Sequence, residues 1–531
     1  MARVGLQSVE GYAFGAIQPT ALLQVPSNTI VSQIISEKMS GFLDIVGSAR
    51  QDEFLEEVSS ERYSEGVARL FNTICSFAAY CGDARFSKVR IFEEDNFFFC
   101  ALPTISTEFI QYILFRLLKL LDANLENESD LVREIEDAKS RARSFLPGGT
   151  NSANFIAAAA LRKIPFKILQ RRYLVFGYGG GSTIFNSSIT ESESSVGVSF
   201  ARSKIATNEL LRLSGLPVAE QWQVRTIERA KEFARKFGYP VVLKPENGSQ
   251  GRGIYANIGD EAELVRCFEK ASQSGDVLLL EKHVAGDHYR VNYMGDTLMM
   301  ALRRRAAEVT GDGRSTVREL VEELNREPER LDPNTNKAQV SFDEDLGRCL
   351  LKQKIALDDV PEVGRQVYLR SISNRSRGGS QVHVEDRIHP ENLELCKQIG
   401  RIMRLDVMGI DLLSPDLSQP WYSNGTVICE VNAQPQLGYS DPEFYWSFMK
   451  RYLRPRIPVN IRVTKGRARA HPPLFDTAVF ELNITLSASD LLRHGCPVQY
   501  FDSLEFEEDV PQGDREKLER LLVSVMPIAE S

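Results

Sequence analysis

Residues 427–432 read VICEVN and decide the fold, because they form a predicted β-strand that carries two polar ligands. Side chains alternate across a strand, so Glu430 and Asn432 are predicted to share one face. Residues 408–413, MGIDLL, read as a second apolar strand with a single acid, Asp411. Prolines and an Asn-Gly pair between the two strands are typical of a hairpin-like link. If the strands pair, these three polar side chains converge.

Oxygen ligands of this kind indicate a site for a hard divalent cation. Asp411, Glu430 and Asn432 offer carboxylate and amide oxygens, which suit Mg²⁺ beside phosphate groups. An acid inside an apolar strand is otherwise costly to bury. The same alternation places Ile428 on the face of the ligands. A structural ion pair is the alternative to metal binding.

Two earlier stretches have the composition of a phosphate-binding site. Residues 239–245, YPVVLKP, form an apolar strand that presents Lys244 at its end, and proline then stops the strand. Residues 248–253, GSQGRG, follow, and their glycines let backbone N–H groups approach an anion. No Gly-Lys-Ser/Thr follows, so this is not a Walker A loop. A solvated lysine and a flexible hairpin turn are the alternatives.

Residues 277–286, VLLLEKHVAG, indicate an edge suited to a heterocycle. The apolar strand ends at Glu281 and continues in extended form to a glycine. Such an edge can offer backbone N–H and C=O groups to a flat ring, although an ordinary strand exit has the same pattern. Residues 177–182, GYGGGS, lack the GxGxxG spacing before a helix and predict a turn or crossing instead.

Composition limits the class of protein. The net charge is −8 and the pI about 5.6, which disfavours nucleic acid as a partner. The eight cysteines form no CxxC pair and lie mostly among apolar residues, which indicates a reducing compartment. No secretory signal is expected, and the apolar stretch 109–121 is interrupted by Arg116 and Lys119 and is too short for a bilayer. We therefore expect a cytoplasmic protein without membrane or nucleic-acid partners.

The chain is predicted to have four segments and an α+β fold. Residues 1–145 form an N-terminal α+β domain, with strands and loops over 1–50 and helical periodicity over 52–80 and 106–145. This domain is a candidate for binding a substrate or partner. The other segments are a connecting region at 146–199, a catalytic domain at 200–465 and an α/β extension at 466–531. In the extension, strands are expected at 478–484 and 498–501 and a helix at 514–525.

Taken together, these segments resemble the ATP-grasp superfamily, and most strongly the ATP-grasp half of cyanophycin synthetase. Further stretches support the resemblance, which covers roughly residues 145–440 well and the first 145 weakly. They are LVFGYG at 174–179, GDGRSTVREL at 311–320, YLR at 368–370, NRSRGG at 374–379 and HPEN at 389–392. The resemblance implies two α+β subdomains that clasp ATP between them.

The resemblance also implies residue roles. Contacts to the nucleotide are implied for Lys204, Lys244, Gly248, Ser249, Gln250, Gly251, Gly253, Glu281, Lys282, His283, Val284 and Asp287. Two Mg²⁺ ions are implied at Asp411, Glu430 and Asn432. Charge on the transferring phosphoryl and the acyl phosphate would be neutralised by Arg290 and by Arg303 or Arg304. The residues implied near the substrate carboxylate are Asn374, Ser376, Gly378 and Gly379. A solvated basic strand is the alternative for the arginines, and His383 and His389 are expected to be structural.

The sequence departs from the family pattern in three places. The family often has a ribose-binding Glu seven residues after the hinge Glu; His288 occupies that position, so we assign ribose to the neighbouring Asp287. After Asn432 the chain reads AQPQLG, where the family usually has Ala-x-Pro-Gly, so a different acceptor substrate is expected. The second, Mur-ligase-like half of cyanophycin synthetase has no counterpart here, so two alternating additions are not expected.

The expected activity is ATP-dependent joining of a carboxylate to an amine through an acyl phosphate. The resemblance favours amino acid or peptide substrates, with ATP and Mg²⁺, in a homodimer or homotetramer. Two alternatives stay open: an ATP-dependent phosphotransferase and a non-catalytic nucleotide-binding partner. The retained acids at Asp411 and Glu430 argue against the second of these.

Overall fold

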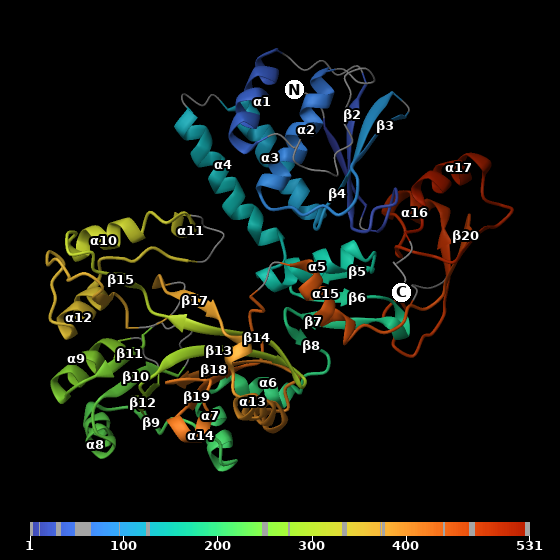
Figure 1. Ribbon diagram of the computed structural model, residues 1–531. Coiled ribbons are helices and arrows are strands. Elements are labelled where there is room, and N and C mark those ends of the chain that lie inside the picture. Colours follow the sequence, from blue (N-terminus) through green and yellow to red (C-terminus); the bar gives the residue numbers. More distant parts are fainter. Residues whose placement is uncertain are drawn as a thin grey trace. The chain divides into compact units, whose positions relative to one another are not determined.

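The computed structural model divides the chain into two compact units (Figure 1). Unit 1 contains Met1–Glu191 and Tyr439–Ser531, and unit 2 contains Ser192–Gly438. Over the residues that the structure describes, no helix has the length and apolar character needed to span a membrane. Those residues are 4–9, 11–27, 33–47, 65–94, 96–123, 128–246, 253–273, 277–331, 337–371, 373, 377–438, 441–466 and 473–525.

The N-terminal part of unit 1 is an antiparallel sheet, in the order β1-β2-β4-β3, that shares one hydrophobic core with four helices. The predicted apolar stripe of α3 is buried in that core. A helix, α1, replaces the strands and loops predicted over residues 33–46, because its apolar residues recur at helical rather than alternating spacing. The elements are β1 (Gly5–Val9), β2 (Thr20–Pro26), α1 (Gln33–Val46), α2 (Glu65–Tyr80), β3 (Arg90–Glu94), β4 (Phe97–Pro103), α3 (Thr107–Asp122) and α4 (Glu128–Ala142).

Two smaller sheets complete unit 1. One is an antiparallel meander, β5-β6-β7-β8, and the other is parallel, β21-β20-β22. The elements are η2 (Arg143–Phe145), α5 (Thr150–Leu161), β5 (Phe166–Leu169), β6 (Tyr173–Phe176), η3 (Gly179–Gly181), β7 (Thr183–Asn186), β8 (Ile189–Thr190), α15 (Pro442–Lys450), β20 (Val459–Thr464), β21 (Leu482–Ser487), α16 (Ala488–His494), β22 (Ser503–Phe506) and α17 (Gln512–Leu521).

The glycine-rich stretch at residues 177–182 is a turn between β6 and β7, as predicted. Its glycines are required by close packing. A Cβ at Gly179 would lie 2.5 Å from the carbonyl oxygen of Val479, and one at Gly181 would lie 2.5 Å from that of Pro455. This stretch therefore packs tightly against the C-terminal part of the same unit.

Unit 2 contains a four-stranded antiparallel sheet, in the order β11-β10-β12-β9. Helices α8 and α9 share a hydrophobic core with this sheet. We call this part the first subdomain. Its elements are β9 (Gln221–Val224), α8 (Ile227–Phe237), β10 (Val241–Pro245), β11 (Tyr255–Ile258), α9 (Glu261–Ser272) and β12 (Leu278–Lys282).

The second subdomain of unit 2 is a five-stranded antiparallel sheet, β17-β14-β13-β18-β19. Helices α6, α7 and α13 contribute to the core on one face, into which alternate residues of β13 and β18 point. Polar residues occupy the other face. The elements are α6 (Ser195–Arg202), α7 (Lys204–Leu213), β13 (Asp287–Met294), β14 (Thr297–Arg305), β17 (Ser380–His383), η5 (Glu385–Arg387), α13 (Pro390–Met403), β18 (Val407–Ser414), α14 (Trp421–Asn424) and β19 (Val427–Asn432).

A third group of elements lies in the chain between β14 and β17 and has a core of its own. We call it the insertion. A capping box at Thr316 and Glu319 begins its first helix. The Thr316 side chain accepts from the backbone N–H of Glu319, and the Glu319 side chain accepts from the backbone N–H of Thr316. The elements are β15 (Glu308–Thr310), α10 (Val317–Leu324), α11 (Pro328–Leu331), α12 (Glu344–Lys352) and β16 (Gln366–Tyr368).

The predicted α+β class is confirmed, and so are the strands around residues 241–243, 277–280, 408–413 and 427–431. The strand predicted at 498–501 is wrong; the chain pairs instead as β22, five residues later. The boundaries of the four predicted segments differ from those of the two units. The division of the chain into four domains stays a prediction.

Candidate functional site

Asp411 and Glu430 lie side by side on the antiparallel pair β18–β19, so the predicted pairing of these strands is confirmed. Asn432 is the register partner of Gly409, two pairs further along. The Asn432 amide Nδ2 donates to the Asp411 carboxylate Oδ2 over 3.4 Å. The three predicted metal ligands are therefore neighbours on one sheet.

A β-bulge changes the predicted alternation on β19. The register shifts between Asp411 and Leu412, and Leu412 pairs with Ile428, which leaves Cys429 as the extra residue. Ile428 and Val431 consequently both lie in the core of the five-stranded sheet. The prediction that Ile428 shares the face of the ligands is wrong, because the extra residue reverses the alternation.

Two arginines hold the Asp411 carboxylate. Arg290 Nε lies 3.3 Å and Arg304 Nη1 lies 3.2 Å from the same oxygen, Oδ1. All three side chains are largely buried. Burial lowers the pKa of the Arg304 guanidinium, and the charge of Asp411 opposes that shift. Among the residues that the structure describes, a second nitrogen of Arg290, Nη1, is buried without a hydrogen-bond partner, so this guanidinium keeps a donor for a ligand.

Glu430 is a partly buried carboxylate that faces Asp411. Burial and then the negative charge of Asp411 raise its pKa, while Lys204, Arg290 and Lys244 oppose the shift. Over the described residues, Glu430 has no side-chain hydrogen bond and no cationic group within ion-pair distance. Two adjacent carboxylates, one of them without a close counter-charge, fit a divalent cation.

The residues present would leave part of a metal's coordination shell to other groups. In the described part of the chain, no cluster of three or more His, Cys, Asp or Glu side chains is placed to hold a metal ion. Mg²⁺ typically takes one or two carboxylates and completes its shell with water and phosphate oxygens. Asp411, Glu430 and Asn432 match that requirement.

A buried ion pair lies in the first subdomain. Lys244 Nζ on β10 is 2.7 Å from Glu281 Oε1 on β12, and the two side chains are 9% and 12% exposed. Gln221 on β9 donates to the same oxygen over 2.6 Å. Burial alone would lower the pKa of Lys244, but the charge and hydrogen bond of Glu281 outweigh it and the pKa is raised. Lys244 therefore stays a cation, and Gln221 is a neighbour that the sequence did not indicate.

Lys204 links the two subdomains at the start of α7. Its Nζ donates to the carbonyl oxygen of Glu246, just after β10, over 2.7 Å. Burial lowers the pKa of Lys204, and the charges of Glu430 and Glu281 oppose that shift. Two lysines and two carboxylates from both subdomains therefore lie close enough for their charges to interact.

The basic strand β14 divides its arginines between two faces. Arg304 points to Asp411, whereas Arg303 forms an ion pair with Asp287 on the face of the sheet core. His288 lies on the site face instead, because it is the register partner of Arg304. Burial lowers the pKa of His288; the charge of Asp411 opposes that shift, and Arg304, Lys244 and Arg290 add to it. The geometry therefore brings His288 to the charged site and keeps the predicted ribose residue, Asp287, away from it.

The remaining predicted residues fall into three groups. Gly248, Ser249, Gln250, Gly251, Asn374 and Ser376 lie outside the described residues. Lys282, His283, Val284 and Gly253 are near the ends of β12 and β11; the backbone N–H of Lys282 donates to Glu220, and that of His283 to Pro240. Gly378, at φ +89°, packs against Arg330, whose guanidinium donates to the Gly378 carbonyl over 2.8 Å. Gly379 is buried beside it.

Two histidines have local structural roles, as predicted. His383 Nδ1 is 2.8 Å from the carboxylate of Glu385. His389 caps the N-terminus of α13 by accepting from the backbone N–H of Glu391 over 3.2 Å. Neither contact involves the charged site.

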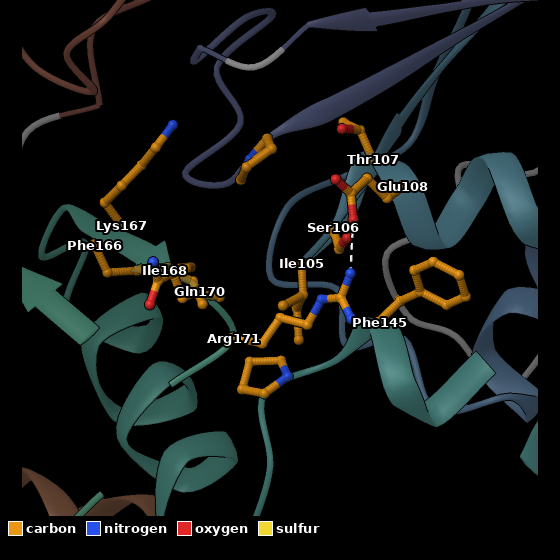
Figure 2. Close-up of a pocket in the computed structure, with 12 residues that line it drawn as sticks. Ile105, Ser106, Thr107, Glu108, Phe145, Phe166, Lys167, Ile168, Gln170 and Arg171 are labelled. Atoms are coloured by element: carbon orange, nitrogen blue, oxygen red, sulfur yellow. Dashed lines mark hydrogen bonds and ion pairs between the residues drawn. The ribbon is translucent and has the colours of Figure 1, made fainter. Parts of the chain in front are cut away.

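A separate cavity of about 450 Å³ lies in unit 1 (Figure 2). It lies between the start of α3 and the β5–β6 turn, where Glu108 and Arg171 form an ion pair over 3.0 Å. Apolar side chains such as Ile105 and Phe166 also line it. None of the predicted site residues belongs to it.

Two antiparallel sheets, each packed against helices, supply most of the charged site within unit 2. Residues 203–297 match the family model described as carbamoyl-phosphate synthase L chain, ATP binding domain. This match and the relatives below confirm the predicted resemblance to the ATP-grasp superfamily and to cyanophycin synthetase.

The chain is 32% identical to the cyanophycin synthetase of Trichormus variabilis over 319 residues, 60% of this chain and 35% of that protein. It is 30% identical over 259 residues to a glutathione biosynthesis bifunctional protein of Mannheimia succiniciproducens, 48% of this chain and 34% of that protein. The chain thus spans about a third of the length of these relatives. A bifunctional glutathione synthetase structure from Pasteurella multocida aligns over 78% of both chains, with 16% identity and a TM-score of 0.40.

Proposed function

We propose that this protein is an ATP-dependent carboxylate–amine ligase that acts on an amino acid or peptide through an acyl-phosphate intermediate. One observation carries the proposal. Helix α7 and two sheets bring together Lys204, Lys244, Arg304 and the carboxylates of Asp411 and Glu430, although these residues are up to 226 positions apart in the sequence (430 minus 204). Opposite charges gathered in a buried site suit the transfer of a phosphoryl group between bound oxygens.

In the first step, the substrate carboxylate attacks the γ-phosphorus of ATP, the bond to the β-phosphate oxygen breaks, and an acyl phosphate and ADP form. Lys244 and Lys204 would hold phosphate oxygens as fixed positive charges. Mg²⁺, when held by Asp411, Glu430 and Asn432, supplies further neutralisation of phosphate charge.

In the second step, the amine attacks the acyl carbon, phosphate leaves with the bonding electrons, and the amine loses one proton. Negative charge develops on the acyl oxygen during this step. Arg290 Nη1 and Arg304 are the donors available for that charge, and they are already oriented by Asp411. No covalent enzyme intermediate is required.

The relatives support this class of reaction. The matched proteins are named for cyanophycin synthesis and glutathione biosynthesis, and the matched family model is named for ATP binding. We also carry over from the resemblance two Mg²⁺ ions, a homo-oligomer and the assigned nucleotide contacts. On β13, His288 faces the charged site and Asp287 faces the core of the sheet, so His288 rather than Asp287 would lie beside the ribose.

The test is ADP release by the purified protein with MgATP and single or paired amino acids and short peptides, with product masses read by mass spectrometry. ADP release only with a pair, and a product of both masses minus water, supports the ligase. A phosphorylated single substrate would instead indicate a phosphotransferase. Glu430→Gln should abolish ADP formation, whereas Glu232→Gln on the exposed surface of α8 is the matched control and should keep it.

A further inference from the structure

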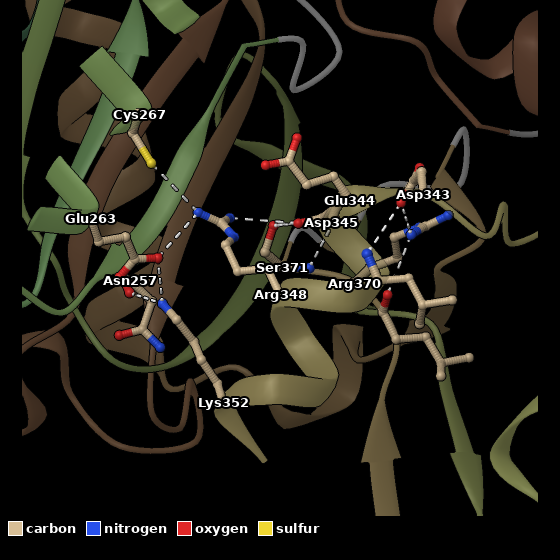
Figure 3. A network of polar contacts seen from close by, with 12 residues as sticks. Asn257, Glu263, Cys267, Asp343, Glu344, Asp345, Arg348, Lys352, Arg370 and Ser371 are labelled. Atoms are coloured by element: carbon tan, nitrogen blue, oxygen red, sulfur yellow. Dashed lines mark hydrogen bonds and ion pairs between the residues drawn. The ribbon is translucent and has the colours of Figure 1, made fainter. Parts of the chain in front are cut away.

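Helix α12 lies between the first subdomain and the rest of the insertion, and charged side chains bind it to both (Figure 3). Towards α9, its Lys352 Nζ is 3.1 Å and its Arg348 Nη1 is 3.5 Å from one oxygen of Glu263. At the other end of the same face, Glu344 is 2.5 Å from Lys270 Nζ. The two helices are therefore held together by a row of ion pairs.

Glu263 makes this row more than a surface contact. Its side chain is 11% exposed, and its second oxygen accepts from the backbone N–H of Gly259 over 2.8 Å. In the described part of the chain, its ion-pair partners are Arg348 and Lys352, both from the insertion. Arg348 also lies 5.9 Å from the ring centroid of Tyr255 on β11. The buried carboxylate of Glu263, in the first subdomain, thus depends on two cations of the insertion for its neutralisation.

The opposite side of α12 is tied to the chain that leads to Gly378. Ser371 Oγ donates to Asp345 Oδ1 over 2.7 Å, and Arg348 Nη2 lies 3.5 Å from the same oxygen. Arg370, which is 4% exposed, donates from Nη1 to Asp343 over 2.8 Å. Arg348 therefore contacts both Glu263 of the first subdomain and the carboxylate that holds Ser371.

The junction between these two parts is polar. The core of the first subdomain and the core of the insertion have no residue in common. Their relative position at α12 is consequently set by charges rather than by interlocked apolar side chains. Separating the two parts would leave the Glu263 carboxylate buried without its cations, so the contact favours joint movement. Lys352 also reaches β11, since its Nζ donates to the carbonyl oxygen of Asn257. Burial and then the positive charge of Lys352 lower the pKa of His283, which follows β12.

We infer that α12 is a strut, in which Arg348 and Lys352 are positioning residues that couple ATP binding in the first subdomain to the placement of Arg370 and Ser371, which precede the predicted substrate residues Gly378 and Gly379 in the chain. The inference rests on the proposed function, because it assumes that the first subdomain binds ATP. When that subdomain closes on the nucleotide, Glu263 carries α12 with it through these two cations. The segment that begins at Arg370 then moves with the nucleotide rather than independently.

The test is hydrogen–deuterium exchange with the non-hydrolysable analogue AMPPNP and Mg²⁺, which requires no substrate. In the wild type, the analogue should slow exchange in β10 and β12 and also in α12 and residues 366–371, by about fivefold or more as for typical coupling between sites. In Arg348→Met/Lys352→Met the slowing should remain in β10 and β12 and vanish from 366–371. Lys352→Arg should behave as wild type.

Lys354→Met is the matched control, since Lys354 is exposed and forms no ion pair in the described part of the chain; it should leave both regions coupled. Slowing confined to β10 and β12 in the wild type, or coupling that persists in the double variant, would overturn the strut and leave the ligase function intact. No slowing anywhere would overturn ATP binding and the strut together.

Discussion

Removing the carboxylate of Glu281 tests whether the buried pair with Lys244 organises the first subdomain. At 2.7 Å and an effective dielectric of about 20, the attraction between the two charges is worth about 6 kcal/mol before desolvation is subtracted. Breaking a buried pair from one side typically costs about 3–5 kcal/mol, because the remaining charge stays buried. Glu281→Gln keeps an oxygen that can accept from Lys244 and Gln221, so we expect a loss of about 3 kcal/mol.

The assay is urea unfolding followed by the fluorescence of Trp222, which lies on β9 beside β12 and stacks on Phe233 with a centroid distance of 4.4 Å. Trp421→Phe and Trp446→Phe provide a background in which Trp222 reports alone. Glu232→Gln on α8 is the matched control, since its partner Arg229 is exposed and such pairs contribute about 0.2–1 kcal/mol. Equal losses in the two glutamine variants would refute the reasoning.

The pH dependence gives a second readout of the same variant. In the wild type the pKa of Lys244 is raised, so its stabilising contribution is present below the unfolded pKa of about 10.4 and is lost as the pH rises through the raised value. Without Glu281, burial loses its two largest opposing causes and only Cys429 and Glu430 still oppose it, so we expect the pKa of Lys244 to be lowered. The variant should then gain stability as the pH rises towards about 10.4. The difference between the two proteins should therefore shrink between pH 7 and about pH 9.5.

Three further predictions concern the second subdomain. Burial and Asp411 raise the pKa of Glu430 in the metal-free site, and a proton competes with Mg²⁺ for that carboxylate. The Mg²⁺ concentration needed for half-maximal ADP formation should therefore begin to rise, as the pH decreases, at a pH above the usual glutamate value of about 4.3; a Mg²⁺ requirement that stays constant down to that value would contradict this. Gly409→Ala would place a Cβ 2.7 Å from Arg290 Nη1. We therefore expect slower ADP formation in steady-state kinetics and a loss of about 1–3 kcal/mol in the free energy of urea unfolding. Unchanged kinetics would refute the packing argument. His389→Ala removes the cap of α13 and should cost about 1 kcal/mol in the same unfolding assay without changing turnover.

The sequence was sufficient for features that depend on local periodicity. The alternation in VICEVN and MGIDLL placed Glu430, Asn432 and Asp411 on neighbouring strands, and the apolar run before Lys244 identified β10. These inferences succeed because a strand's two faces are fixed by its own residues. The order of the motifs then indicated the ATP-grasp resemblance.

Pairing between distant residues was decided only by the tertiary structure. The bulge at Cys429 moved Ile428 into the core, because an extra residue on one strand is visible only from its partner. The division of Arg303 and Arg304 between Asp287 and Asp411, and the choice of His288 over Asp287 for the site face, required the register of β13 and β14.

The ion pairs that join separate elements were equally hidden. Lys244 and Glu281 are 37 positions apart (281 minus 244), and Glu263 and Lys352 are 89 apart (352 minus 263), so neither spacing carries a signal in the sequence. Each charge taken alone is typical of a solvated surface residue. Only folding brings the two members of a pair into a shared region of low dielectric, where the loss of hydration makes each dependent on the other. The sequence by itself thus determined which strands carry the chemistry, and the tertiary structure decided which charges meet there.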